Sequence, residues 1–417
     1  MKKKATIISV LLASSLIIGV LIIFFGNQGD TPDARILWTF DDESMFYYSV
    51  PAIDNEGNVY IGSAHKWRAV EDGLLLSDHY YLYSLFPNGS LRWKFDSGRR
   101  EIRGGPVIGL NSMIYFVAEN HSDHQVRTRD ELLALNHDGT LNWSSIIWTD
   151  LPVDPGGHGM DYCTPAIDAD GIVYVMGENL TSFYGLNGTV RWSNNINPDF
   201  WGSPSIQGET IYIPARGLLA YDLNGTFKWR FDPPGEPRSV HKPAIDSDGA
   251  IYFGDENNHV HAVFPNGTTK WTFNIPVQHG QARGNPAIDD DGTIYIGTKA
   301  DTSSTFFAIN PDGSLKWQYA SPLRDVYSSP AIGNDGSIFF ASEDRKLFCV
   351  EKTNGRLKWS VQLRGDVTWS SVALNSDGIA FIGDMSGRLY AVQTECTGLN
   401  ECPWPRWGRF NTGTANS

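Results

Sequence analysis

Apolar and polar positions alternate in short runs along almost the whole chain, and the runs are separated by Asn, Asp and Gly. One complete unit contains, in order, a Pro-Ala-Ile element at 243–245, a turn at 246–249, runs at 251–254 and 260–263, a turn at 266–268 and a run at 270–273. Short alternating runs joined by such turns predict antiparallel strands in hairpins. We therefore predict that each unit forms one four-stranded sheet.

The unit occurs eight times, which makes the chain a repeat protein. The first element recurs at Pro51, Pro106, Pro165, Pro204, Pro243, Pro286, Pro330 and, as a variant, Val372. The last element carries a tryptophan each time, at Trp38, Trp93, Trp143, Trp192, Trp229, Trp271, Trp317 and Trp359. Four-stranded units repeated about every 40–50 residues predict a β-propeller. Because the tryptophans share one position, we expect them to be structural and to pack between neighbouring blades.

The two ends of the repeat region complement each other. The last unit has runs at 372–374, 379–383 and 388–392 but no tryptophan strand, whereas the run at 36–40 precedes the first unit. Pairing this N-terminal strand with the last unit would close the ring and leave no open edge. We therefore predict an all-β, eight-bladed propeller over residues 36–395.

The N-terminal segment predicts a membrane anchor. Lys2, Lys3 and Lys4 precede an uncharged run from Ala5 to Phe25, which at 1.5 Å per residue can span a hydrocarbon core of about 30 Å. The lysines should stay in the cytoplasm. We expect a transmembrane signal-anchor at 1–26, a linker at 27–35 and a propeller outside the cell membrane. A cleaved signal peptide and a secreted protein are the alternative.

The net charge of the chain limits the classes of partner that it can bind. The net charge is −14, and only 19% of residues are charged. Nucleic acid binding needs clustered Lys and Arg, so we expect no nucleic acid partner. We expect a monomer that meets the membrane only through its N-terminal helix.

The repeat resembles a known family. The pattern Pro-Ala-Ile-Asp, Gly-x-Ile-Tyr-Ile-Gly, Leu-Tyr-Ala-Leu and Asn-Gly-x-Leu-Lys-Trp is similar to the pyrroloquinoline-quinone (PQQ)-type repeat of quinoprotein alcohol dehydrogenases and BamB-like assembly scaffolds. The resemblance covers about 36–395, and the segment 404–413 resembles a tail seen beside such repeats. It implies a PQQ-like propeller, and it implies fold more strongly than function.

The same resemblance bears on catalysis. Dehydrogenases of the family hold the quinone and Ca²⁺ above the propeller axis and share an adjacent Cys-Cys pair near the cofactor. This chain has no Cys-Cys pair, and it has no Cys-x-x-Cys-His motif that could bind a haem. We therefore place the chain in the non-enzymatic branch and expect no cofactor. A PQQ- and Ca²⁺-dependent dehydrogenase remains an alternative.

Two patterns invite a metal interpretation. The Asp-rich turns at 168–171, 246–249 and 289–292 resemble the start of a calcium loop, but a strand resumes at once, which favours hairpin turns. His259 and His261 should point to the same side of one strand. Without an obvious carboxylate partner, packing or surface roles are favoured over zinc. We predict no metal.

The four cysteines fall into two groups. Cys396 and Cys402 are close in sequence in the tail at 396–417, on the side of the membrane where disulfides form, and we predict a bond between them. Cys163 and Cys349 belong to blades on opposite sides of the ring and cannot meet. We predict that both are buried free thiols.

A candidate binding ring precedes the first strand of each blade. Three positions before each Pro, or its Val372 equivalent, stand Tyr48, Arg103, Tyr162, Trp201, Val240, Arg283, Tyr327 and Trp369. Aromatic and arginine side chains dominate binding hot spots. These residues lie on the face whose links are longest, where binding residues tend to lie. We interpret them as a recognition ring for a peptide, glycan or partner loop, and packing between blades is the alternative.

These patterns together favour a protein-binding scaffold at the cell envelope, with an envelope protein or peptide as partner. A propeller that binds a glycan or a small ligand is the alternative within the binding class.

Overall fold

The computed structural model describes residues 35–403, except 43, 47, 65–67, 71–72, 76–78, 121–128, 150–162, 178, 197–201, 236–240, 277–279, 301–303 and 320–322. The chain divides into two compact units, 1–33 and 34–417. The predicted transmembrane helix and linker fall almost wholly outside the described residues. Among the described residues, no helix is both long enough and apolar enough to cross a membrane.

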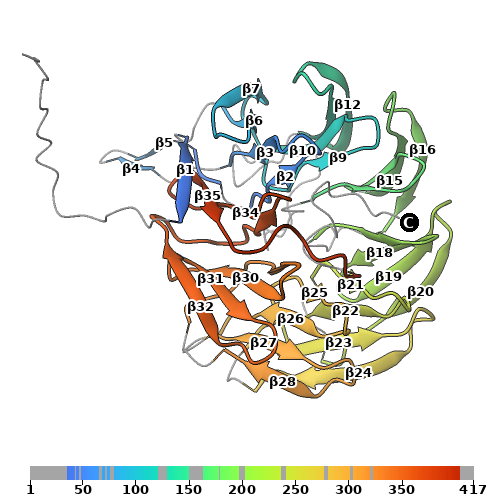
Figure 1. Ribbon diagram of the computed structural model, residues 1–417. Helices are drawn as coiled ribbons and strands as arrows, with labels where there is room; N and C mark the ends of the chain where they lie inside the picture. The colour runs from blue at the N-terminus through green and yellow to red at the C-terminus, as the bar shows by residue number, and fades with distance from the viewer. Residues whose placement is uncertain are drawn as a thin grey trace, which may run out of the picture. The chain divides into compact units, whose positions relative to one another are not determined.

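Eight antiparallel sheets form the second unit and follow one another around a ring (Figure 1). Blades 1 to 4 are β2 (Ala52–Ile53), β3 (Val59–Gly62), β6 (Tyr81–Leu85), β7 (Leu91–Asp96); β9 (Val107–Ile108), β10 (Ile114–Asn120), β11 (Arg129–Leu135), β12 (Leu141–Thr149); β13 (Ala166–Ile167), β14 (Ile172–Met176), β15 (Asn179–Tyr184), β16 (Val190–Asn195); and β17 (Ser205–Gln207), β18 (Thr210–Pro214), β19 (Leu218–Asp222), β20 (Phe227–Phe231).

Blades 5 to 8 repeat the order. They are β21 (Ala244–Ile245), β22 (Ile251–Gly254), β23 (His259–Val263), β24 (Thr269–Asn274); β25 (Ala287–Ile288), β26 (Ile294–Gly297), β27 (Phe306–Ile309), β28 (Leu315–Gln318); β29 (Ala331–Ile332), β30 (Ser337–Ser342), β31 (Lys346–Glu351), β32 (Leu357–Gln362); and β33 (Ala373–Leu374), β34 (Ile379–Gly383), β35 (Arg388–Gln393), β1 (Ile36–Asp41). The eight-bladed prediction is confirmed.

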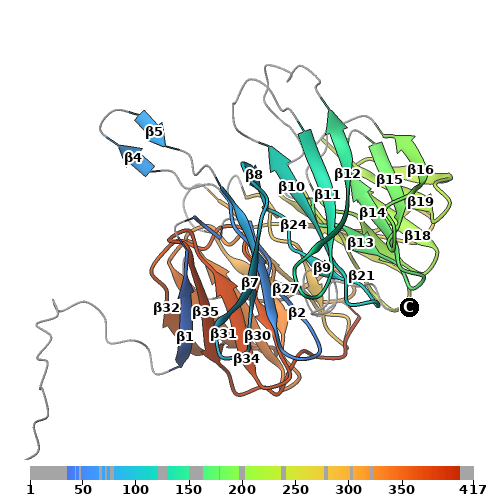
Figure 2. The ribbon, with the colours of Figure 1, turned by 90° about the horizontal axis from the view of Figure 1, so that it is seen from above.

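The N-terminal strand closes the ring, as predicted. β1 pairs antiparallel with β35, with Thr39 opposite Tyr390 and Phe40 opposite Leu389. The structure adds two small elements that the repeat pattern does not contain. These are the hairpin of β4 (Arg68–Val70) and β5 (Gly73–Leu75), which stands out from the blades in Figure 2, and β8 (Arg100–Glu101), which pairs with β10.

Seven of the repeated tryptophans join one blade to the next. Each indole N–H donates to a backbone carbonyl in the last hairpin turn of the following blade, at 2.8–3.1 Å. A ring of the second strand packs beside each tryptophan, as Tyr252 does beside Trp271 with 5.7 Å between centroids. The predicted structural role of the tryptophans is confirmed.

Trp359 is the exception, and ring closure explains it. The third and fourth strands of blade 8 come from opposite ends of the chain, so no hairpin turn stands opposite Trp359. Its indole N–H has no hydrogen-bond partner among the described residues. The Arg35 guanidinium instead lies 4.6 Å from the centre of the Trp359 ring.

The Asp-rich turns are hairpin turns. Asp246 Oδ1 accepts the backbone N–H groups of Asp248 and Ala250, and Oδ2 accepts the Tyr252 hydroxyl at 2.8 Å. Asp168 does the same with Asp170, Ile172 and Tyr174. In these two turns the chain itself uses the carboxylate oxygens, which favours the hairpin interpretation over the calcium one.

The prediction for the cysteines is confirmed for Cys163 and Cys349 but not for the proposed disulfide. Cys163 and Cys349 are buried free thiols, and burial raises the pKa of each to about 12. The predicted Cys396–Cys402 disulfide is not formed, since Cys396 is a free thiol whose Sγ lies 2.9 Å from Thr394 Oγ1. Cys396 packs in the core shared by blades 7 and 8, whereas Cys402 packs in the core shared by blades 6 and 7.

Candidate functional site

Three of the predicted ring residues stack on one another at the channel mouth. Each lies in a link that leads into the first strand of a blade, Tyr48 in blade 1, Tyr327 in blade 7 and Trp369 in blade 8. The Trp369 ring lies between the other two, with centroids 5.4 Å from Tyr48 and 4.6 Å from Tyr327. Both pairs are stacked nearly parallel, at 13° and 22°.

The stack extends across the mouth to the opposite part of the ring. The His241 imidazole, in the link to blade 5, lies 5.7 Å from Trp369. Blades 5 and 8 are three places apart in a ring of eight, so contact between their links requires the Trp369 indole to lie over the channel. We call Tyr48, His241, Tyr327 and Trp369 the mouth cluster.

Two members of the mouth cluster have unusual backbone conformations. Tyr48 and Trp369 have φ values of 59° and 60°, in the left-handed region that bulky residues rarely adopt. The Ser370 hydroxyl donates to the Ser49 carbonyl at 2.8 Å and ties the two links together. Strained aromatic residues that the surrounding structure holds in place are typical of functional sites.

The members of the mouth cluster differ in how far their side chains are exposed. Tyr48 and Tyr327 are only 8% and 7% exposed, whereas Trp369 is partly accessible. Burial of the two tyrosines favours the alternative interpretation, packing between blades, whereas Trp369 is the most accessible of the three rings. The Tyr327 hydroxyl donates to Asp325 at 2.8 Å, and burial together with this carboxylate raises the pKa of Tyr327.

Two other predicted ring residues, Arg103 and Arg283, form ion pairs. Arg103 pairs with Glu101 at 2.5 Å, and Arg283 pairs with Glu256 at 2.7 Å. Tyr162, Trp201 and Val240 lie outside the described residues.

Within the part of the chain that the structure describes, one nitrogen atom of the mouth cluster and one beside it are buried without a hydrogen-bond partner. His241 Nε2 and Arg283 Nε have no hydrogen-bond partner among the described residues. Burial, with the nearby Arg283 charge, lowers the pKa of His241 to about 3, so the imidazole is neutral. A buried polar atom without a partner costs about 1–3 kcal/mol.

Sequence reasoning missed His241 because it placed the ring three residues before each Pro. In blade 5 that position is Val240, and the aromatic ring stands one residue later. Allowing a shift of one residue would have found it.

The opposite face carries a separate groove. A cavity of about 370 Å³ lies between the hairpin turns of blades 2 and 3. Its lining includes Leu110, Tyr184 and Leu186, which are 70%, 47% and 71% exposed. Hairpin turns and blade-to-blade links lie at opposite ends of an antiparallel blade, so this groove and the mouth cluster are different sites.

Comparisons with known proteins agree with this architecture. The model of a family described as outer membrane protein assembly factor BamB matches twice, over residues 128–299 and 256–396. The crystal structure of BamB from Moraxella catarrhalis superposes with a TM-score of 0.61 at 13% identity, covering 86% of this chain and 99% of that one. The computationally designed Ika8 protein superposes at 0.62 and 11% identity, covering 87% and 100%. No curated protein sequence matches the chain.

Proposed function

This chain belongs to the family of outer membrane protein assembly factor BamB, and on that premise we propose that it is a protein-binding scaffold of the cell envelope. The two family matches together span well over half of the chain, and the BamB-like propeller fits a scaffold role. We propose that the scaffold is not catalytic and that it binds an envelope protein or peptide.

The mouth cluster carries the proposal. Trp369 is a large aromatic side chain, held in a strained conformation between two tyrosines and partly accessible. A rigid aromatic side chain that a partner can reach is typical of a binding hot spot. We therefore propose that the partner's contact centres on Trp369.

We also propose that residues 1–26 anchor the protein in the cell membrane, with the propeller outside. The support is the sequence alone, namely three lysines followed by an uncharged apolar run long enough to span a bilayer.

The test is site-directed photo-crosslinking in the native cell. A photoreactive phenylalanine analogue replaces Trp369, and in a second variant it replaces Leu110 beside the groove on the opposite face. The control replaces Phe227, which lies on the outer strand β20 and is 53% exposed.

A specific envelope protein cross-linked at 369 but not at 227 would support the proposal. Cross-linking at 110 alone would place the partner on the opposite face and contradict the assignment to Trp369. Equal labelling at all three positions would contradict a specific site.

The groove supports a second candidate function, binding of a small ligand or glycan. Its lining combines an exposed tyrosine with exposed leucines, and Trp143 donates its indole N–H to the Gly185 carbonyl in the same lining. Trp143 should therefore report on an occupant by fluorescence. Saturable quenching that Trp143→Phe removes would support this function.

A further inference from the structure

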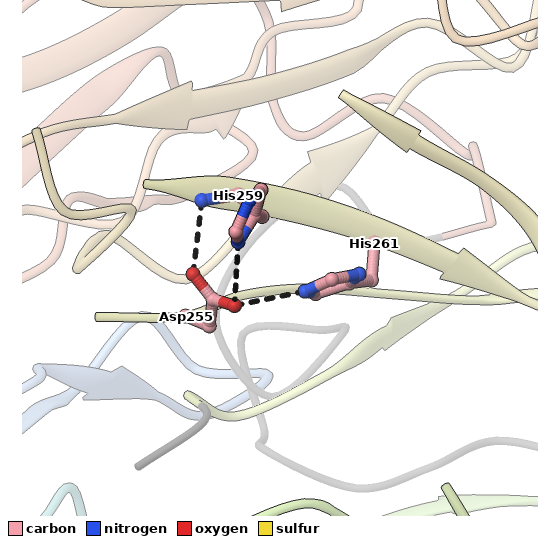
Figure 3. Close-up of side chains that lie close together, drawn as sticks. All are labelled: Asp255, His259 and His261. Atoms are coloured by element: carbon pink, nitrogen blue, oxygen red, sulfur yellow. Dashed lines mark hydrogen bonds and ion pairs between the residues drawn. The ribbon is translucent and has the colours of Figure 1, made fainter. Parts of the chain in front are cut away.

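An aspartate and two histidines converge at the end of blade 5, as Figure 3 shows. Asp255 follows β22 directly, and His259 and His261 lie on β23. Asp255 Oδ2 is 2.9 Å from His261 Nε2 and 3.1 Å from His259 Nδ1. The candidate ligand atoms of all three side chains lie within 4.8 Å of one another. The structure thus supplies the carboxylate partner that the sequence pattern of two histidines lacked.

Blade 8 contains the same turn without the histidines. Asp384 follows β34 as Asp255 follows β22, and its Oδ1 likewise accepts the backbone N–H groups two and four residues later. At the positions equivalent to His259 and His261, blade 8 has Arg388 and Tyr390. The Tyr390 hydroxyl donates to Asp384 Oδ2 at 3.0 Å, as His261 bonds to Asp255 Oδ2, so the turn accounts for a donor at this position but does not require an imidazole there. The turn does not account for His259, which brings a second nitrogen to the same carboxylate oxygen.

The spacing of the three side chains suits a metal ion. Zinc binds nitrogen and oxygen ligands at about 2.0–2.1 Å in a tetrahedron, which puts neighbouring ligand atoms about 3.3 Å apart. The two nitrogen-to-oxygen distances in the cluster, 2.9 and 3.1 Å, are shorter than this by a few tenths of an ångström. Small side-chain adjustments would admit the ion in place of two protons.

The surroundings also suit a metal site. His261 Nδ1 lies 3.2 Å from Thr272 Oγ1, which can accept a hydrogen bond from the Nδ1–H group and orient the ring, as outer-shell groups do around metal-bound histidines. Phe231 and Phe253 pack against the His261 ring and exclude water from that side. His259 is 22% exposed at the side chain, so an ion and a fourth ligand can reach the cluster from solvent.

We propose that Asp255 Oδ2, His259 Nδ1 and His261 Nε2 bind a divalent transition-metal ion, with zinc as the best fit, and leave a fourth position open to water or a partner. The ion would brace the turn beside the mouth cluster, because Ala282 N–H donates to the Asp255 carbonyl and Glu256 pairs with Arg283. This site is independent of the proposed scaffold function.

The test uses the full-length protein, stripped of metal with a chelator and titrated with zinc chloride. Calorimetry gives the affinity, and elemental analysis after dialysis gives the stoichiometry. His259→Ala and His261→Gln each remove one ligand. His79→Ala is the matched control, because His79 pairs with Asp96 at 2.7 Å on the surface and lies outside the cluster.

We expect one zinc per chain, an affinity at least tenfold weaker in both ligand variants, and no change in the control. We also expect zinc to raise the melting temperature of the unaltered protein but not of the His259→Ala variant. Zinc bound equally well by all four proteins, or bound at well below one ion per chain, would overturn the proposal. His259 is partly exposed, so its variant keeps the test valid where His261→Gln fails to fold.

Discussion

At the residue scale, the tryptophans provide a comparison within one molecule. The Trp271 indole N–H donates to the Pro311 carbonyl at 2.9 Å, whereas the Trp359 indole N–H has no partner among the described residues. Replacing tryptophan by phenylalanine removes this donor and part of the ring in both cases. We expect Trp271→Phe to cost about 1 kcal/mol more of unfolding free energy than Trp359→Phe. Urea unfolding of both variants measures the difference, and equal costs would show that the hydrogen bond contributes nothing.

The turn glycines give a second comparison at this scale. Gly139 and Gly171 have φ values of 87° and 76°, which strain any side chain. A Cβ at Gly139 would lie 2.6 Å from the Trp93 ring, whereas a Cβ at Gly171 would meet nothing within 4 Å. We expect Gly171→Ala to cost about 1 kcal/mol from backbone strain alone, and Gly139→Ala about 2–3 kcal/mol because the indole must move. Thermal unfolding of the two variants should rank them in that order, and the reverse order would refute the role of the indole.

A salt bridge in blade 6 predicts a pH dependence. Burial raises the pKa of Asp291, but hydrogen bonds from Lys316, at 2.9 Å, and from Thr293 outweigh it, and the pKa falls to about 2. Because the folded-state pKa is lower than in the unfolded chain, the pair stabilises the fold above about pH 4. This contribution is lost as the pH falls from about 4 to 2.

Asp291→Asn should therefore lower the unfolding free energy at pH 7, by less than about 1 kcal/mol because the pair is half exposed, and by much less at pH 2. Urea titrations at both pH values measure this. An equal effect at both would contradict the assignment.

At the element scale, strand periodicity and turn chemistry were enough to predict eight blades and the pairing of β1 with β35. These features repeat, so each copy supports the others. The hairpin of β4 and β5 and the strand β8 each occur once, so the repeated sequence pattern does not predict them. The mouth cluster was predicted only in part, because a shared position before each Pro does not say how far a side chain reaches. Trp369 meets His241 from a link three blades away, and that contact depends on closure of the ring.

Closure by β1 also predicts the effect of truncation. A protein that begins at residue 35 keeps β1, whereas one that begins at residue 42 loses it and exposes the edge of β35. Exposed edges pair with other chains. We expect the first protein to stay monomeric and to unfold in one transition, and the second to aggregate or to unfold at a much lower temperature. Light scattering and calorimetry distinguish them, and similar behaviour of the two would show that β1 is not needed for closure.

At the scale of the whole molecule, the sequence suggests two compartments, with a basic end inside and an acidic body outside. Lys2, Lys3 and Lys4 are the only charged residues before the end of the apolar run, and the rest of the chain carries the acidic excess. If the run at 5–25 is a retained anchor, the native protein should be found in the membrane fraction with its N-terminal residues intact. Protease added outside should cut the propeller away, because the positive-inside rule leaves only the lysines in the cytoplasm. Mass spectrometry of the membrane-bound and soluble forms identifies the first residue of the mature chain. A soluble mature chain that begins after residue 25 would instead identify the run as a cleaved signal peptide and place the scaffold free of the membrane.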